Sequence, residues 1–144
     1  MPKILIPYDD SGPALRAVKQ VAASRETMGK VEAVLLNVQH TDFFIERLVD
    51  GRKSEIERLE QPLRDLGEKL LRKAAAVLEK AGVRCSAHVE LGNPAPIIAD
   101  YAKKYHCDMI VMGTRGLGTV HSLVLGSVAT KVLHLSEVPV MLVR

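Results

Sequence analysis

The chain has 144 residues, a length that suits one domain with a single substantial core. Only 3% of the residues are aromatic, so the core must be aliphatic, which favours strands and helices in layers over a sandwich built on aromatic anchors. The net charge of +3 is spread among alternating acidic and basic residues, whereas a DNA-binding protein gathers its basic residues on one face, so we expect no nucleic-acid partner.

The first apolar run, Lys3–Tyr8, has the length of a strand. It is near-continuous in apolar residues, which is typical of a strand buried on both faces of a parallel sheet. A signal peptide needs a longer apolar region and a small-residue cleavage site, and no run elsewhere approaches membrane-spanning length. The sequence therefore predicts a cytoplasmic protein that does not enter a membrane.

A helix and a second buried strand follow. Apolar residues recur at helical spacing from Ala14 to Met28, and the pattern ends near Gly29. The run Val31–Val38 is again near-continuous in aliphatic residues and predicts a second strand. The segment Gln39–Gly51 is the one long loop that we expect.

The longest helical pattern covers about Lys53–Ala81, with Gly82 as its C-terminal cap. Pro62 falls inside this pattern, so its first turns are expected to be kinked or separate. The next run, Val83–Leu91, alternates polar and apolar residues and is therefore expected at an edge of the sheet.

Two further helices and two strands complete the chain. Asn93 as N-cap and Pro94 at the first helical position predict the start of the third helix. The strand Met109–Met112 follows, and the last helix and strand are predicted over Gly126–Ser136 and Val138–Val143. Each strand except the last is thus followed by a helix.

This β-α order predicts the fold. Helical crossovers join parallel strands, so residues 1–144 are expected to form one α/β domain, an open five-stranded parallel sheet with helices on both faces. Ligands of such sheets bind outside the carboxyl ends of the strands. We therefore expect the site in the loops after Tyr8, Val38, Leu91 and Met112.

The loop after the fourth strand carries the strongest signal for a ligand. It contains Gly113 and Gly116, and Gly126 and Ser127 open the following helix. Glycines let backbone N–H groups approach a ligand, and a helix N-terminus offers unpaired N–H groups, which together suit phosphates. Ser127 adds a hydroxyl and Arg115 a cation. The glycines alone leave open that the loop is a flexible turn, with Gly126 kept for packing.

The spacing Gly113-x2-Gly116-x9-Gly126-Ser127 resembles the G-x2-G-x9-G-(S/T) signature of ATP-binding universal stress proteins. The resemblance covers the whole chain. The segments that are similar to the opening strand and aspartate loop, the second strand, the third loop and the last strand of that family are Lys3–Ser11, Leu35–Val38, Gly92–Ala95 and Pro139–Arg144.

The family resemblance implies a Rossmann-like fold of the adenine nucleotide alpha hydrolase type, with strand order 3-2-1-4-5. It implies ATP as the ligand, with Mg²⁺ bound through the phosphates. It also implies an antiparallel homodimer through the C-terminal strand, which agrees with the tendency of an apolar edge strand to pair with another chain.

The same resemblance implies ten nucleotide-binding residues. Pro7 would line the nucleoside pocket, and Asp9 would contact the ribose or a phosphate-bound metal. The backbone of Val38 would contact the adenine edge, and Met112 and Gly113 would flank the sugar and the first phosphate. The phosphates would be held by Arg115, Gly116, Gly126, Ser127 and Val128.

Two acidic residues in the first loop need separate interpretation. Asp10 stands where the family usually has glycine, and a second carboxylate repels a triphosphate unless it points away or helps to hold Mg²⁺. Asp9 has an alternative role, because either Asp9 or Ser11 can cap the helix that starts near Pro13. We favour a ligand contact for Asp9.

The histidines, the cysteines and two tyrosines have simpler expectations. Cys85 and Cys107 lack metal-ligand spacing and are expected to be small buried hydrophobic residues. Tyr101 and Tyr105 lie four apart on a helix and are expected to pack. The histidines are expected to be exposed: His40, His88, His106, His121 and His134.

No catalytic arrangement accompanies the glycine loop, and members of the similar family are nucleotide binders with slow or no hydrolysis. We therefore expect an ATP-binding stress-response module whose nucleotide occupancy alters its conformation or its partners. Two alternatives stay open. One is a slow ATPase in which Asp9 or Asp10 positions Mg²⁺. The other is a dimeric scaffold that holds no nucleotide.

Overall fold

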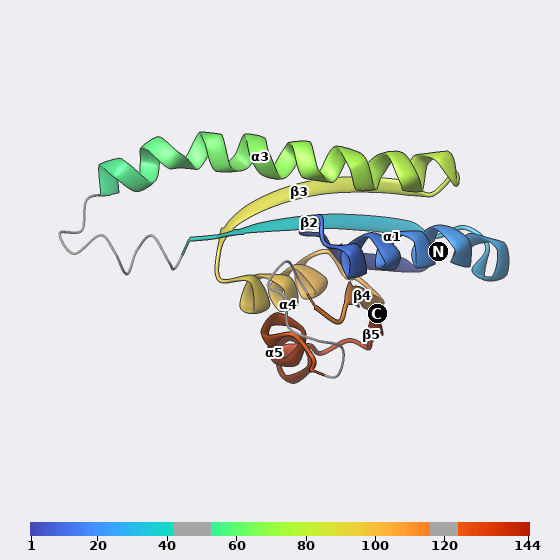
Figure 1. The fold of residues 1–144 in the computed structure, drawn as a ribbon. Coiled ribbons are helices and arrows are strands. Elements are labelled where there is room, and N and C mark those ends of the chain that lie inside the picture. Colours follow the sequence, from blue (N-terminus) through green and yellow to red (C-terminus); the bar gives the residue numbers. More distant parts are fainter. Residues whose placement is uncertain (42–52, 116–123) are drawn as a thin grey trace.

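The computed structural model describes residues 1–41, 53–115 and 124–144, with side chains in the second range from residue 57 onward. Strands and helices alternate in the predicted order (Figure 1). The elements are β1 (Lys3–Pro7), α1 (Gly12–Met28), β2 (Glu32–His40), α3 (Lys53–Lys80), β3 (Arg84–Gly92), α4 (Pro94–Lys104), β4 (Met109–Gly113), α5 (Ser127–Leu135) and β5 (Val140–Val143).

The five strands form one parallel sheet in the order β3-β2-β1-β4-β5, which confirms the expected fold. Strand β1 is central, and β3 lies at an edge as its alternating pattern predicted. The chain leaves β1 towards β2 on one side and later returns to add β4 on the other side. Strand order therefore reverses between β1 and β4, which is where ligands bind in sheets of this kind.

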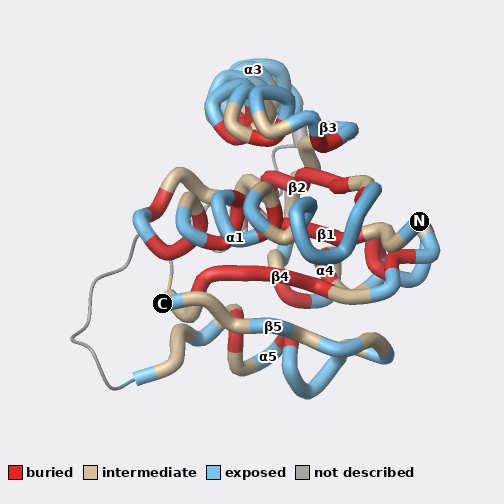
Figure 2. The backbone as a smooth tube through the Cα atoms, turned by 90° about the vertical axis from the view of Figure 1, so that its right-hand side faces the viewer, coloured by how far each residue is buried: buried red, intermediate tan, exposed pale blue. Residues whose placement is uncertain are grey.

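Helices cover both faces of the sheet, as expected (Figure 2). Helices α1 and α3 pack on one face, and α4 and α5 pack on the other. Successive residues of β1 supply the two cores: the fully buried Ile6 side chain belongs to the first and that of Leu5 to the second. This alternation is the period-2 geometry of a strand buried on both faces.

The long helix α3 runs unbroken through Pro62, so its first turns are not a separate element, which was one of the two alternatives that we expected there. Proline lacks the N–H that would bond to the carbonyl four residues earlier, at Arg58. Both Pro62 and Arg58 are exposed, so water can solvate that carbonyl. Figure 1 shows α3 lying along β3 over most of its length. No helix in the described part of the chain is long and apolar enough to cross a membrane.

The loop expected over Gln39–Gly51 begins later than predicted, because β2 extends to His40. Its residues from 42 onward lie outside the described ranges, as does His121. The expected burial of the cysteines is confirmed for Cys107, whereas Cys85 is half-buried. Burial raises the pKa of both thiols.

The expectation for His88 is wrong, although His40, His106 and His134 are exposed as expected. His88 is half-buried between β3 and α4, with its ring 5.8 Å from that of Tyr101 and 4.9 Å from that of Tyr105. The Tyr101 hydroxyl donates to Glu90, so the polar residues near the C-terminal end of β3 contact α4 instead of facing water. Burial lowers the pKa of His88, with an opposing effect from Glu90 and a smaller lowering effect from Lys104.

We expect the free energy of unfolding to fall as the pH is lowered from about 7.5 to about 5.5, and His88→Gln to reduce this fall. The unfolded chain protonates His88 near its ordinary pKa of 6.5, above the native pKa. The contribution of His88 to the free energy of unfolding is therefore fully present above pH 6.5 and is lost as the pH falls from there towards the native pKa. Urea unfolding at both pH values measures the change, and His134→Gln is the control because His134 is exposed on α5. Equal pH dependence in His88→Gln and the wild type would contradict this assignment.

Candidate functional site

A cavity of about 400 Å³ opens at the carboxyl ends of the strands, where the strand order reverses. Nine of the ten predicted ligand-binding residues line it: Pro7, Asp9, Val38, Met112, Gly113, Arg115, Gly126, Ser127 and Val128. The tenth, Gly116, lies outside the described residues. Residues that are separated by more than one hundred positions in the sequence are thus brought to one surface.

One end of the cavity is formed by the N-terminus of α5. Gly126 is the N-cap residue in an extended conformation, and the backbone N–H groups of the first helical turn, which begins with Ser127 and Val128, have no partners within the helix. The Gly126 N–H itself donates to the Thr114 carbonyl over 2.7 Å, which holds the two ends of the glycine loop together. Such a helix terminus, with Arg115 on the wall, has the charge and the donors that an anionic group requires.

Close packing requires glycine at position 113 and favours it at position 126. A Cβ atom on Gly126 would lie 3.1 Å from the Thr114 carbonyl oxygen and 3.2 Å from the Arg115 Cα atom. A Cβ atom on Gly113 would lie 2.7 Å from the Pro13 Cβ atom and 2.9 Å from the Ala14 nitrogen. The packing role that the sequence left open for Gly126 is therefore present, and it coexists with a place on the cavity wall.

The other walls are mainly apolar. Besides the predicted Pro7, Val38 and Met112, they include residues that the sequence analysis did not identify: Leu36, Pro94, Ile98, Ala129 and, as a polar group, His40. Pro94 and Ile98 come from the start of α4, which follows one of the strand-end loops where a site was expected. An apolar slot beside a cationic, donor-rich end suits a ligand with a flat apolar part and an anionic part.

Asp9 lines the cavity and does not cap a helix. Its Oδ1 atom accepts the Ser11 N–H over 3.0 Å, and the Ser11 Oγ atom accepts the Ala14 N–H over 3.2 Å. Ser11 is therefore the N-cap of α1, which decides between the two capping alternatives. Asp9 places a carboxylate in the cavity wall, where it can accept hydrogen bonds from hydroxyl groups or coordinate a cation.

Asp10 does not line the cavity. Its Oδ1 atom accepts a hydrogen bond from the Tyr8 hydroxyl over 2.7 Å and from the Lys73 ammonium over 3.1 Å. These two hydrogen bonds, that from Tyr8 first, lower the pKa of Asp10. Burial, with the bond to Asp10 as a second cause, raises the pKa of Tyr8. The second carboxylate of the loop thus points towards α3 and away from the cavity, which is one of the two alternatives that the sequence analysis gave for it.

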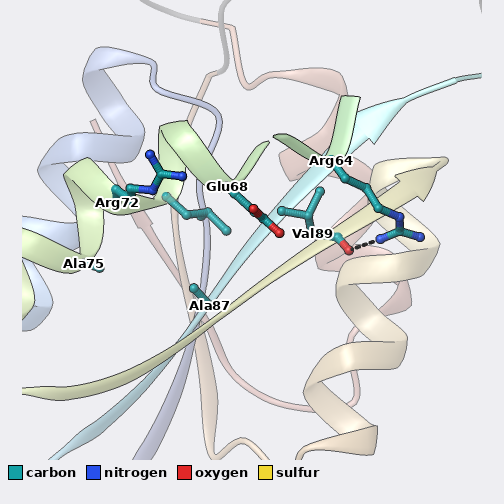
Figure 3. Close-up of a pocket in the computed structure, with 7 residues that line it drawn as sticks. Arg64, Glu68, Arg72, Ala75, Ala87 and Val89 are labelled. Atoms are coloured by element: carbon teal, nitrogen blue, oxygen red, sulfur yellow. Dashed lines mark hydrogen bonds between the residues drawn. The ribbon is translucent and has the colours of Figure 1, made fainter. Parts of the chain in front are cut away.

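A second cavity, of about 370 Å³, lies between α3 and the edge strand β3 (Figure 3). Arg64 on its rim donates through Nη1 to the Val89 carbonyl over 3.0 Å, and its Nε atom lies 3.2 Å from a Glu60 carboxylate oxygen. Glu68 stands between Arg64 and Arg72, so the wall carries charges of both signs. This cavity has neither a glycine loop nor a helix N-terminus, and we do not assign it the anionic ligand.

A family model and a curated relative both relate this chain to the same family. A family model described as the universal stress protein family matches residues 1–144. The chain is 39% identical over 142 residues to a universal stress protein of Thermus aquaticus, covering 98% of this chain and 97% of that protein.

Solved structures show the same fold. Protein MJ0577 of Methanocaldococcus jannaschii superposes with a TM-score of 0.81 at 30% identity, covering 98% of this chain and 94% of that one. A universal stress protein family member from Arabidopsis thaliana, solved with AMP bound, gives a TM-score of 0.70 at 21% identity, over 99% of this chain and 91% of that one.

Proposed function

This chain belongs to the universal stress protein family, and from that premise we propose that the cavity between the ends of β1 and β4 binds an adenine nucleotide. The observation that carries the proposal is the convergence of nine predicted residues on one cavity with an apolar slot and a helix N-terminus at its end. The AMP complex of the Arabidopsis relative supports the ligand class.

Each part of an adenylate has a complementary part of the cavity. The apolar slot between Val38 and Met112 suits the adenine ring, whose edge would meet the Val38 backbone. Asp9 suits the ribose hydroxyls or a phosphate-bound Mg²⁺, because carboxylate oxygens accept hydrogen bonds from hydroxyl groups and coordinate Mg²⁺. The α5 N-terminus with Ser127 and Arg115 suits the phosphates. We propose ATP, with Mg²⁺ bound through its phosphates, as the physiological ligand.

We propose that nucleotide occupancy regulates a cytoplasmic stress-response module, and that the protein acts by changing conformation or partners. The test is to denature the purified protein, identify any released nucleotide by mass spectrometry, and titrate nucleotide-free protein with AMP and Mg-ATP by calorimetry. Released adenylate and saturable heats, with GTP giving none, are the expected results. No released nucleotide and no heat with either ligand would instead favour the dimeric scaffold.

We also propose an antiparallel homodimer through β5. Within the described residues β5 pairs with β4 alone, so it is the second edge of the sheet. The Pro139 and Val143 carbonyls accept N–H groups from the β4 side. The backbone groups of the alternate residues, Val140 and Leu142, therefore face the open edge. Met141 is 44% exposed, which leaves apolar surface beside unpaired donors and acceptors, a combination that favours pairing with a second copy.

A further inference from the structure

Three residues, two from the loop after β1 and one from α3, meet beside the candidate site, on the side of the sheet that α1 and α3 cover. Asp10 accepts hydrogen bonds from Tyr8, just beyond β1, and from Lys73 on α3. Its backbone is left-handed, with a φ of 64°. This conformation is costly for most residues and is tolerated best by glycine, asparagine and aspartate. Asp10 thus adopts a conformation that glycine would adopt freely, and its side chain is held in place by two donors.

The turn at Asp10 determines where the neighbouring carboxylate lies. Tyr8 is 2% exposed and packs in the core under α1 and α3, and it lines the cavity together with Asp9. The left-handed residue then reverses the chain, so that the Ser11 N–H reaches back to the Asp9 carboxylate over 3.0 Å. A change in the backbone at Asp10 would therefore move or release the carboxylate of Asp9.

The turn is held from the sheet as well as from α3. The Asn37 Nδ2 atom donates to the Tyr8 carbonyl over 2.9 Å, and the buried Asn37 side chain accepts a hydrogen bond from Gln39 over 2.7 Å. Helix α3 approaches the same point, because a Cβ atom on Gly67 would lie 2.7 Å from the Asn37 Oδ1 atom. The loop around Asp10 is thus held by Asn37 on the sheet side and by Lys73 on the α3 side.

We infer that Asp10 is a positioning residue for the nucleotide site: Tyr8 and Lys73 hold its carboxylate, and its left-handed backbone directs Asp9 into the cavity. Asp10 acts through Asp9 and touches no ligand. The inference rests on the proposed nucleotide binding. It assigns to the aspartate at this position a function that a glycine there does not have, which is to connect the loop of the site to α3.

The test compares Asp10→Ala, Asp10→Asn and Lys73→Met in two measurements. The first is AMP affinity by calorimetry, and the second is the amide ¹H shift of Ser11 in nucleotide-free protein, which reports its hydrogen bond to Asp9. Asp10→Ala should weaken AMP binding by about tenfold, because alanine disfavours the left-handed conformation, and should move the Ser11 signal upfield. Asp10→Asn should keep the AMP affinity and the Ser11 signal of the wild type, since asparagine tolerates the left-handed conformation and its amide oxygen accepts a hydrogen bond from Tyr8.

Lys73→Met is the second variant, and it should fold because the Lys73 side chain is 58% exposed. It should weaken AMP binding by up to about threefold, as expected for an exposed ion pair, and have no further effect in the Asp10→Ala background. Wild-type AMP affinity and an unmoved Ser11 signal in both Asp10→Ala and Lys73→Met would overturn the inference. If the wild type itself binds no AMP, the proposed function fails, and the Ser11 signal still decides whether Asp10 positions Asp9.

Discussion

Gly126→Val should weaken the binding of AMP and Mg-ATP by at least about 100-fold. The new Cβ atom would lie 3.1 Å from the Thr114 carbonyl oxygen and 3.2 Å from the Arg115 Cα atom, so the loop that carries Arg115 must move away from α5. The branched side chain would also occupy the cavity wall at the helix N-terminus. Losing two charge-assisted hydrogen bonds to phosphate, worth roughly 1.5–3 kcal/mol each, gives an effect of that size.

The matched control is Gly12→Val, also at a helix N-terminus. The three atoms nearest to a Cβ atom on Gly12 all belong to the guanidinium end of Arg16, the closest at 3.1 Å, and this flexible side chain can move away. Gly12 does not line the cavity, so this variant should bind AMP like the wild type. Calorimetric titration measures both variants, and circular dichroism checks that Gly126→Val is folded. A folded Gly126→Val protein with wild-type AMP affinity would refute the assignment of the phosphate end.

Met141→Asp should convert the proposed homodimer to a monomer at micromolar concentration, raising its dissociation constant by at least about 100-fold. A charge on an edge strand opposes pairing with another strand, because pairing would strip water from it. Twofold symmetry places the substitution in the interface twice, and each copy also loses roughly 1 kcal/mol of apolar burial, because Met141 is 44% exposed. Light scattering of the purified protein over a dilution series measures the mass directly.

Leu66→Asp on α3 is the control for Met141→Asp. Leu66 is 47% exposed against 44% for Met141, so the two substitutions remove similar apolar surface in different places. The Leu66 variant should keep the mass of the wild type. A wild type that is monomeric at micromolar concentration would contradict the dimer itself. A dimeric Met141→Asp protein would show that the subunits meet through another surface.

The order of strands and helices follows from the amino-acid sequence alone, because it depends on short-range patterns. Apolar runs such as Lys3–Tyr8 indicate strands buried on both faces, and the alternation in Val83–Leu91 correctly placed that strand at an edge. The position of the cavity was also predictable, since strand-end loops and helix N-termini are where backbone groups are free to bind. The family resemblance carried by the spacing from Gly113 to Ser127 then implied nine of the residues that line it.

Other features depended on contacts between distant segments, which no local pattern encodes. His88 was expected in water, but α4 brings Tyr101 and Tyr105 against it and leaves it half-buried. Ile98 reaches the cavity wall only because α4 packs on the sheet face beside β1. These positions follow from the packing of whole helices, which is decided by the complete core.

Asp10 separates the two kinds of information most clearly. The sequence determined that a second carboxylate follows Asp9 in the loop after β1. Only the tertiary structure decided that this carboxylate turns away from the cavity, because both of its donors are placed by packing. Tyr8 is held by the burial of its side chain in the core, and Lys73 is brought there by the docking of α3. A side chain follows the partners that satisfy its charge, and those partners are set by the fold.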